Sequence, residues 1–156
     1  MKRLTAVALC LGAAALAGGC MKPAAPDLTV QQFMARKVDP ASKVYFSSVQ
    51  YISDETGNHD IKPETDADWA KVQQSAVDLQ AYGKALQTPG YTEGRNPDWT
   101  TFSQSLVEIS QQAETAAKAK DPDKVFEVSG TIYAVCDACH MAYPKDSKTP
   151  GGGSAS

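Results

Sequence analysis

The sequence predicts an all-α domain, an antiparallel four-helix bundle, on three observations. Apolar residues recur in steps of three and four over residues 65–88, 96–120 and 121–143, as on one face of a helix. Asn96-Pro97 and Asp121-Pro122 each place a capping residue before a proline, which is typical of a helix start. β-Branched residues fall at helical spacing and not in alternation, so strands are not expected.

The first predicted helix follows Asp27 and is interrupted in its middle. Its first part carries Val30, Phe33, Met34 and Lys37. Asp39-Pro40 then interrupts it, because proline lacks a backbone donor and disfavours helix at the residue before it. Its continuation from Pro40 carries Val44, Tyr45, Val49 and Ile52. We therefore expect a kinked or split helix, followed by a polar loop over residues 53–64 that contains Gly57-Asn58 and Pro63.

The second predicted helix begins after Thr65, which has Asp68 three residues later at capping-box spacing. Its apolar positions are Trp69, Val72, Ala76, Leu79, Gly83 and Leu86. Thr88-Pro89-Gly90 ends this helix, and a loop from Pro89 leads to Asn96.

The third predicted helix begins at Pro97 and the fourth at Pro122. The third carries Trp99, Phe102, Leu106, Ile109, Ala113 and Ala116. The fourth carries Val125, Val128, Ile132, Val135 and Cys139 and ends before Pro144. Four aromatic residues on or beside these apolar seams are expected in the core: Trp69, Trp99, Phe102 and Phe126.

The first residues resemble a targeting segment. Lys2 and Arg3 precede an apolar run that ends at Leu16 and is too short to span a membrane, so residues 1–19 are predicted to be a signal peptide. The sequence before Cys20 resembles a bacterial lipoprotein cleavage box, which implies lipid on Cys20 and a periplasmic, membrane-anchored protein. Ordinary cleavage near Ala17 is the alternative.

The mature chain is predicted to consist of one domain between two short tethers. Residues 20–27 are the lipid anchor and tether, 28–145 the helical domain, and 146–156 a disordered tail without apolar content. Without Lys2 and Arg3 the chain has 13 basic and 18 acidic side chains, a formal charge of −5. That charge argues against nucleic acid as a partner, because nucleic-acid binding needs a basic face.

Residues 136–140 read Cys-Asp-Ala-Cys-His, the attachment signature of a c-type haem. Cys136 and Cys139 lie at i and i+3, so on a helix both thiols face the same way and can bond to one porphyrin, with His140 as the proximal iron ligand. A thioredoxin-like redox pair would belong beside a βαβ pattern. A structural zinc site needs four ligands, and His59 is the only other histidine. A disulfide would leave His140 unexplained. We therefore expect one covalent haem c with its iron.

Four helical segments with C-x-x-C-H on the last one resemble the class II cytochromes c, the cytochrome c-prime family. The resemblance covers Leu28 to Tyr143. It implies contacts of Tyr143 and Lys145 with the haem edge, although Pro144 displaces the base by one position from the family pattern. Members of this family often form dimers through the first helix, so a homodimer is a further expectation.

The family divides by what stands on the second side of the iron. A methionine on the first helix gives low-spin members that transfer electrons between redox proteins, and Met34 matches that position. Members with an open position instead bind nitric oxide or carbon monoxide, and Met34 would then fill core space. His59 is a weaker iron ligand because it lies in a polar loop. No enzymatic activity is expected, since an electron carrier needs neither a nucleophile nor an acid–base pair.

Overall fold

A computed structural model describes residues 26–144. This part of the chain is mostly helical. Its elements are α1 (Val30–Phe33), a π-helix (Met34–Val38), α2 (Asp39–Ser48), β1 (Gln50–Asp54), β2 (Gly57–Ile61), α3 (Asp66–Leu86), α4 (Pro89–Thr92), α5 (Pro97–Lys118) and α6 (Pro122–Ala142). Several predictions lie outside the described residues: the signal peptide, the lipid on Cys20, the haem-edge contact of Lys145 and the tail.

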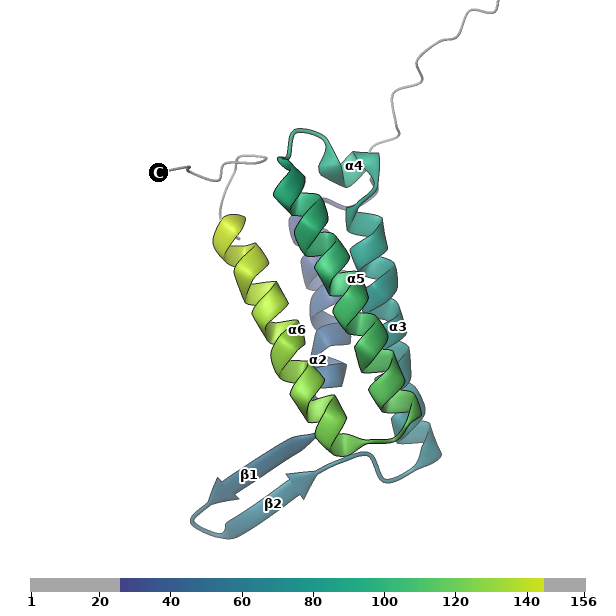
Figure 1. Cartoon of the computed structure of the whole chain (residues 1–156), viewed down its shortest axis with the longest axis vertical. Helices are drawn as coiled ribbons and strands as arrows, with labels where there is room; N and C mark the ends of the chain where they lie inside the picture. Colours follow the sequence, from purple (N-terminus) through teal and green to yellow (C-terminus); the bar gives the residue numbers. More distant parts are fainter. Residues whose placement is uncertain (1–25, 145–156) are drawn as a thin grey trace, which may run out of the picture.

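The helices α2, α3, α5 and α6 lie side by side, and each runs opposite to the one before it (Figure 1). α5 packs along both α3 and α6, and α2 packs along α3, whereas α2 and α6 touch only lightly. Of the four sides of this arrangement, the side between α2 and α6 is therefore the least closely packed. Within residues 26–144, no helix is both long and apolar enough to cross a membrane.

The predicted starts of the second, third and fourth helices are confirmed, whereas the first helix is capped by Thr29 and not by Asp27. Thr65 and Asp68 form a reciprocal capping box, in which the Asp68 N–H donates to Thr65 Oγ1 at 3.2 Å and the Thr65 N–H donates to Asp68 Oδ2 at 3.3 Å. Asn96 and Asp121 are the N-caps of α5 and α6, each followed by a proline in the first turn. Proline fits there because its missing donor would have no partner within the helix.

The interruption predicted at Asp39-Pro40 is a π-helix and not a split. Pro40 has no N–H to donate to the carbonyl of Arg36, so a regular α-helical turn cannot be completed there. The turn widens instead, and the Asp39 N–H donates to the carbonyl of Met34, five residues back. α1, the π-helix and α2 thus form one helical stretch with an extra residue in its middle.

The prediction of a helix through Ile52, a loop beyond it and no strands was wrong. α2 ends at Ser48, Val49 is extended, and residues 50–61 form an antiparallel hairpin that pairs Gln50 with Ile61. Valine, tyrosine and isoleucine favour extended backbone, which explains the change after Ser48. Asp54 closes the turn by accepting from the Thr56 N–H at 2.8 Å, and Gly57 supplies a φ of +128°.

The hairpin is held against the start of α6, and this contact changes the role expected for Phe126. The Tyr51 hydroxyl donates to the Asp123 carboxylate, and the rings of Tyr51 and Phe126 meet edge to face with centroids 5.1 Å apart. Phe126 is 48% exposed, so its assignment to the core was wrong. It follows Val125 by one position and is therefore turned away from the buried seam.

The core has two parts, and α6 contributes buried side chains to only one of them. The part nearer the hairpin contains Val125, Val128 and Ile132 of α6, together with Trp69. The part at the other end is built around Phe33, Leu79, Leu86, Tyr91 and Trp99. None of its buried members among residues 26–144 comes from α6. The second half of α6 therefore stands apart from this core.

Candidate functional site

A cavity of about 840 Å³ lies between the second half of α6 and the first helical stretch, on the side where α2 and α6 pack least closely. Cys136, Cys139 and His140 line it from α6, and Met34 lines it from the π-helix. The sequence had singled out these four residues, and the fold brings them to one cavity although about a hundred positions separate Met34 from the others. The lining also includes apolar or aromatic side chains from several elements: Leu28, Val30, Val38, Phe46, Tyr91, Trp99, Tyr133 and Tyr143.

Helical periodicity explains why both cysteines face this cavity. The apolar seam of α6 continues from Ile132 through Val135 to Cys136 and Cys139, but only Ile132 is fully covered. Both thiols are half-buried and are not joined in a disulfide. The apolar face of α6 is thus only partly buried where the C-x-x-C-H motif begins. His140 follows in the last turn of α6.

The environment of the two thiols is not that of reactive thiolates. Burial raises the pKa of the Cys136 thiol above its usual range. Burial, with a contribution from the neighbouring Cys136, raises the pKa of Cys139 to about 11. Redox-active cysteine pairs have lowered pKa values, because the thiolate is the nucleophile. Both thiols are therefore protonated near neutral pH, which disfavours a thioredoxin-like role.

Met34 is half-buried and is positioned by its neighbours in the helix. Phe33, one residue earlier, is buried between Tyr82 and Tyr91, with ring centroids 5.5 and 5.3 Å away. Val38 is buried at the other end of the π-helix. These anchors hold the segment against the core, while Met34 lies at the cavity wall.

Tyr143 closes the cavity at the end of α6. Its hydroxyl group hydrogen-bonds the Asn96 side chain, and its ring stands at 90° to the ring of Trp99 with centroids 5.1 Å apart. Its backbone N–H donates to the carbonyl of Cys139 at 2.8 Å. Burial raises the pKa of the Tyr143 hydroxyl, helped by the nearby charge of Asp98. Tyr143 thus lines the same cavity as the motif, while Lys145, the other residue expected at the haem edge, lies outside the described residues.

Sequence reasoning missed Arg95, which also lines the cavity. It follows a tight turn in which Glu93 has φ −56° and ψ 126°, Gly94 has φ +75°, and the Arg95 N–H donates to the carbonyl of Thr92 at 3.1 Å. These angles define a type II turn, whose third position favours glycine. Gly94 could have indicated the turn, but nothing in the sequence indicates that Arg95 faces the motif on α6.

The structure keeps His59 away from this cavity. His59 lies on the exposed hairpin, where its Nε2 is 2.7 Å from the Thr56 hydroxyl and 3.3 Å from Asp54 Oδ1. The hairpin is at the opposite end of the molecule from the end of α6 (Figure 1). Within residues 26–144, no group of three or more His, Cys, Asp or Glu side chains is arranged to hold a bare metal ion.

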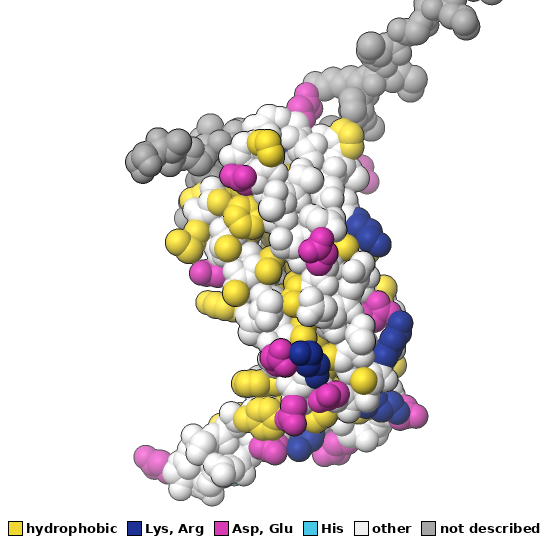
Figure 2. All heavy atoms as spheres, viewed as in Figure 1, with side chains coloured by type: hydrophobic (Ala, Val, Ile, Leu, Met, Phe, Trp, Pro, Cys, Tyr) yellow, Lys and Arg dark blue, Asp and Glu magenta, His cyan; other side chains and the backbone are white. Residues whose placement is uncertain are grey.

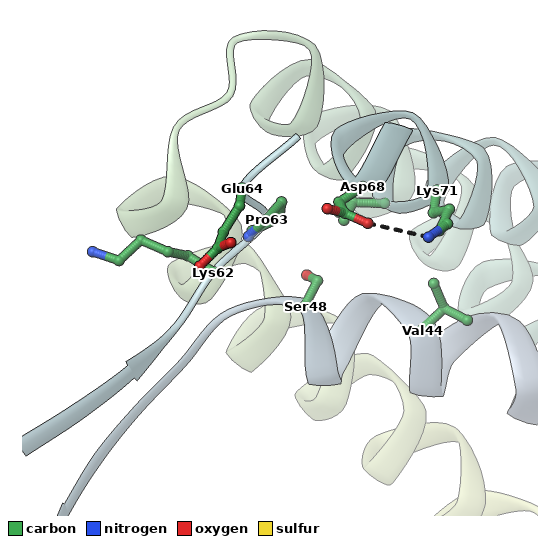
Figure 3. A pocket seen from close by; sticks show the side chains of 8 residues that line it. Val44, Ser48, Lys62, Pro63, Glu64, Asp68 and Lys71 are labelled. Atoms are coloured by element: carbon green, nitrogen blue, oxygen red, sulfur yellow. Dashed lines mark hydrogen bonds and ion pairs between the residues drawn. The ribbon is translucent and has the colours of Figure 1, made fainter. Parts of the chain in front are cut away.

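A second hollow, of about 360 Å³, lies at the base of the hairpin between α2 and the start of α3 (Figure 3). Lys71 donates to Asp68 there at 3.1 Å, and Asp68 also caps α3. Two of the four charged side chains that line this hollow are thus already paired with each other. It contains none of the residues that the sequence singled out for chemistry.

No family model, curated protein or solved structure matches the chain. The interpretation of the cavity therefore depends on its own residues and surroundings. Hydrophobic side chains gather over the α6 side of the molecule (Figure 2). The large exposed ones on this helix are Phe126, Tyr133 and Met141.

Proposed function

We propose that residues 28–145 form an antiparallel four-helix bundle of the class II cytochrome c type, which holds one haem c and carries single electrons between redox proteins. The observation that carries this proposal is that Cys136, Cys139, His140 and Met34 line one cavity of about 840 Å³. Cofactor sites commonly measure about 300–1,000 Å³ and are mostly apolar. The apolar lining and the half-covered seam of α6 suit a flat, hydrophobic cofactor.

The motif residues have complementary tasks. Cys136 and Cys139 lie one helical turn apart, and each thiol can add across one vinyl group of the porphyrin. Sulfur bonds to one vinyl carbon and the thiol hydrogen goes to the other, so the addition needs no oxidant. The imidazole of His140 supplies the proximal ligand to the iron. When bound, the haem supplies a one-electron Fe(III)/Fe(II) couple.

Met34 would be the second protein ligand of the iron in this proposal. Its thioether sulfur is a soft donor, which favours the ferrous state and raises the reduction potential. The apolar side chains around it keep water out and disfavour the extra charge of the ferric state. Because Met34 is held by the buried Phe33 and Val38, little rearrangement of the protein is needed when an electron arrives.

The optical spectrum of the purified protein tests the role of Met34. A low-spin spectrum with a weak thioether-to-iron band in the red is expected, and Met34→Ala should remove that band. Met141→Ala is the matched control, because Met141 is 76% exposed and does not line the cavity. A high-spin spectrum that Met34→Ala leaves unchanged, with ready binding of carbon monoxide, would contradict electron transfer and favour a protein that binds nitric oxide or carbon monoxide.

Covalent attachment has a separate test. Replacing both Cys136 and Cys139 by serine should abolish haem staining on a denaturing gel, while each single variant should retain one thioether. Staining that persists in the double variant would refute covalent attachment of the haem through Cys136 and Cys139.

The proposal includes export to the periplasm and a lipid anchor on Cys20. Metabolic labelling with a radioactive fatty acid should mark the full chain and should fail in Cys20→Ser. Equal labelling of the two proteins would exclude Cys20 as the lipidated residue. A wild-type chain that takes up no label would instead favour ordinary cleavage near Ala17 without lipid.

A further inference from the structure

Arg95 is fixed at the wall of the cavity by three separate interactions. The type II turn at Glu93-Gly94 sets its backbone. Its Nη1 donates to the carbonyl of Tyr91 at 2.5 Å. Its guanidinium carbon lies 4.2 Å from the centre of the Trp99 ring, within cation–π distance. Trp99 is itself buried and donates from Nε1 to the carbonyl of Leu86 at 2.7 Å.

The positive charge of Arg95 is not engaged in an ion pair with the described part of the protein. The carboxylate that lines the same cavity, Asp39, is paired with Lys43 at 2.7 Å. Arg95 is the only lysine or arginine among the described lining residues. A half-buried, immobilised guanidinium next to an apolar cavity is suited to an anion, above all a planar carboxylate.

We infer that Arg95 is the anion-binding residue of this cavity and pairs with a carboxylate of the bound haem, a propionate. The inference rests on the proposed function. It assigns to a residue of the α4–α5 loop the haem-edge contact that the sequence had suggested for Lys145. It also orients the cofactor, because the thioethers lie on α6 and the carboxylate then points towards the loop between α4 and α5.

The test uses the purified holoprotein and measures its midpoint reduction potential as a function of pH. A guanidinium next to a carboxylate lowers the pKa of that carboxylate by about 1–3. Arg95→Gln should therefore raise the proton affinity of the propionate about tenfold or more and move the corresponding inflection of the potential to higher pH. Arg95→Lys keeps the charge but loses the planar fork, so it should give a smaller displacement.

Three further measurements make the result specific. Arg36→Gln is the matched control, because Arg36 is exposed, does not line the cavity, and its loss changes the net charge equally. In the holoprotein, where the thiols of Cys136 and Cys139 are bonded to the haem, the other ionisable groups that line the cavity are Asp39 on α2, His140 on α6 and the hydroxyl groups of three tyrosines. Asp39→Asn shows whether that carboxylate produces the inflection. Haem staining of each variant shows whether the cofactor is still attached.

The possible results separate this inference from the proposed function. A displaced inflection in Arg95→Gln, absent from Arg36→Gln and retained in Asp39→Asn, supports the pairing. Unchanged titration of Arg95→Gln with full haem staining overturns the role of Arg95 and leaves the cytochrome proposal intact. An inflection that disappears in Asp39→Asn belongs to that side chain and also overturns the inference. A wild-type chain without covalent haem overturns both proposals.

Discussion

Two helical glycines give a sharp test of how closely α3 and α5 pack. Gly83 lies inside α3, and a β-carbon built there would be 2.8 Å from Val107 Cγ2, 3.0 Å from the carbonyl oxygen of Ser103 and 3.2 Å from the backbone nitrogen of Val107. Gly130 lies inside α6, and a β-carbon there would meet nothing within 4 Å. Alanine should therefore stabilise the protein at position 130 but not at position 83.

The magnitudes follow from two terms. Replacing glycine by alanine inside a helix stabilises it by about 1 kcal/mol at either position. At position 83 the added methyl group must also push α5 away, and overpacking of this kind costs about 1–3 kcal/mol. The 3.0 Å contact with Ser103 involves backbone, so a side-chain rotation of Val107 cannot relieve it. The gain from replacing glycine by alanine in a helix is the same in both variants. Their unfolding free energies should therefore differ only by the cost of overpacking, about 1–3 kcal/mol.

Urea unfolding followed by far-ultraviolet circular dichroism measures both free energies. We expect Gly130→Ala to raise the midpoint and Gly83→Ala to lower it or leave it nearly unchanged, with equal slopes for the wild type and both variants. If Gly83→Ala stabilised the protein as much as Gly130→Ala, the close approach of α3 and α5 would be refuted. A changed slope would instead indicate altered compactness of one of the states.

Three other predictions concern the helix caps, the hairpin and the core. Thr65→Ala removes half of a capping box and should lower the unfolding free energy by about 0.5–2 kcal/mol in urea, and no loss would contradict the cap. The hydrogen bond to Asp123 is the chief reason why the pKa of Tyr51 is raised from 10 to about 12. Because this pKa is higher in the folded state, the contribution of the Tyr51 hydroxyl group to protein stability is complete below pH 10 and is lost as the pH rises to 12. Ultraviolet titration of Asp123→Asn should show this pKa falling towards 10, and an unchanged value would exclude the bond. Trp69→Ala should cost about 3–5 kcal/mol and Phe126→Ala much less, since their exposed fractions are 9% and 48%, so equal losses would contradict the exposed position of Phe126.

Much of the helical framework could be predicted because its signals are local. A capping residue followed by proline, as at Asn96 and Asp121, marks a helix start through interactions within a few residues. The seam positions of α3, α5 and α6 follow from a repeat that needs no knowledge of neighbours. The hairpin was missed because Val49 and Ile52 continue the helical spacing of Val44 and Tyr45, and only the wider context decides between the two periods.

The candidate site could be predicted in part. Cys136, Cys139 and His140 are adjacent in sequence, and helical spacing alone places the two thiols on one face. Met34 came from a family resemblance, and in the structure it lines the same cavity. Arg95 could not be predicted, because its approach to the cavity depends on how the α4–α5 loop folds over Trp99. Such a contact is tertiary, and the local sequence shows only the turn at Gly94.

The π-helix makes the direction of Met34 depend on chain length. A π-turn contains one residue more than the α-turn that it replaces, and one residue corresponds to a rotation of about 100° around a helix axis. Deleting one exposed residue between Met34 and Asp39 would remove the extra residue of this turn while α2, with the buried Tyr45, stays packed against α3. The same deletion would rotate Met34 away from the cavity. Substitutions in this turn can change the chemistry of the wall, but only an insertion or a deletion can change which residue faces it.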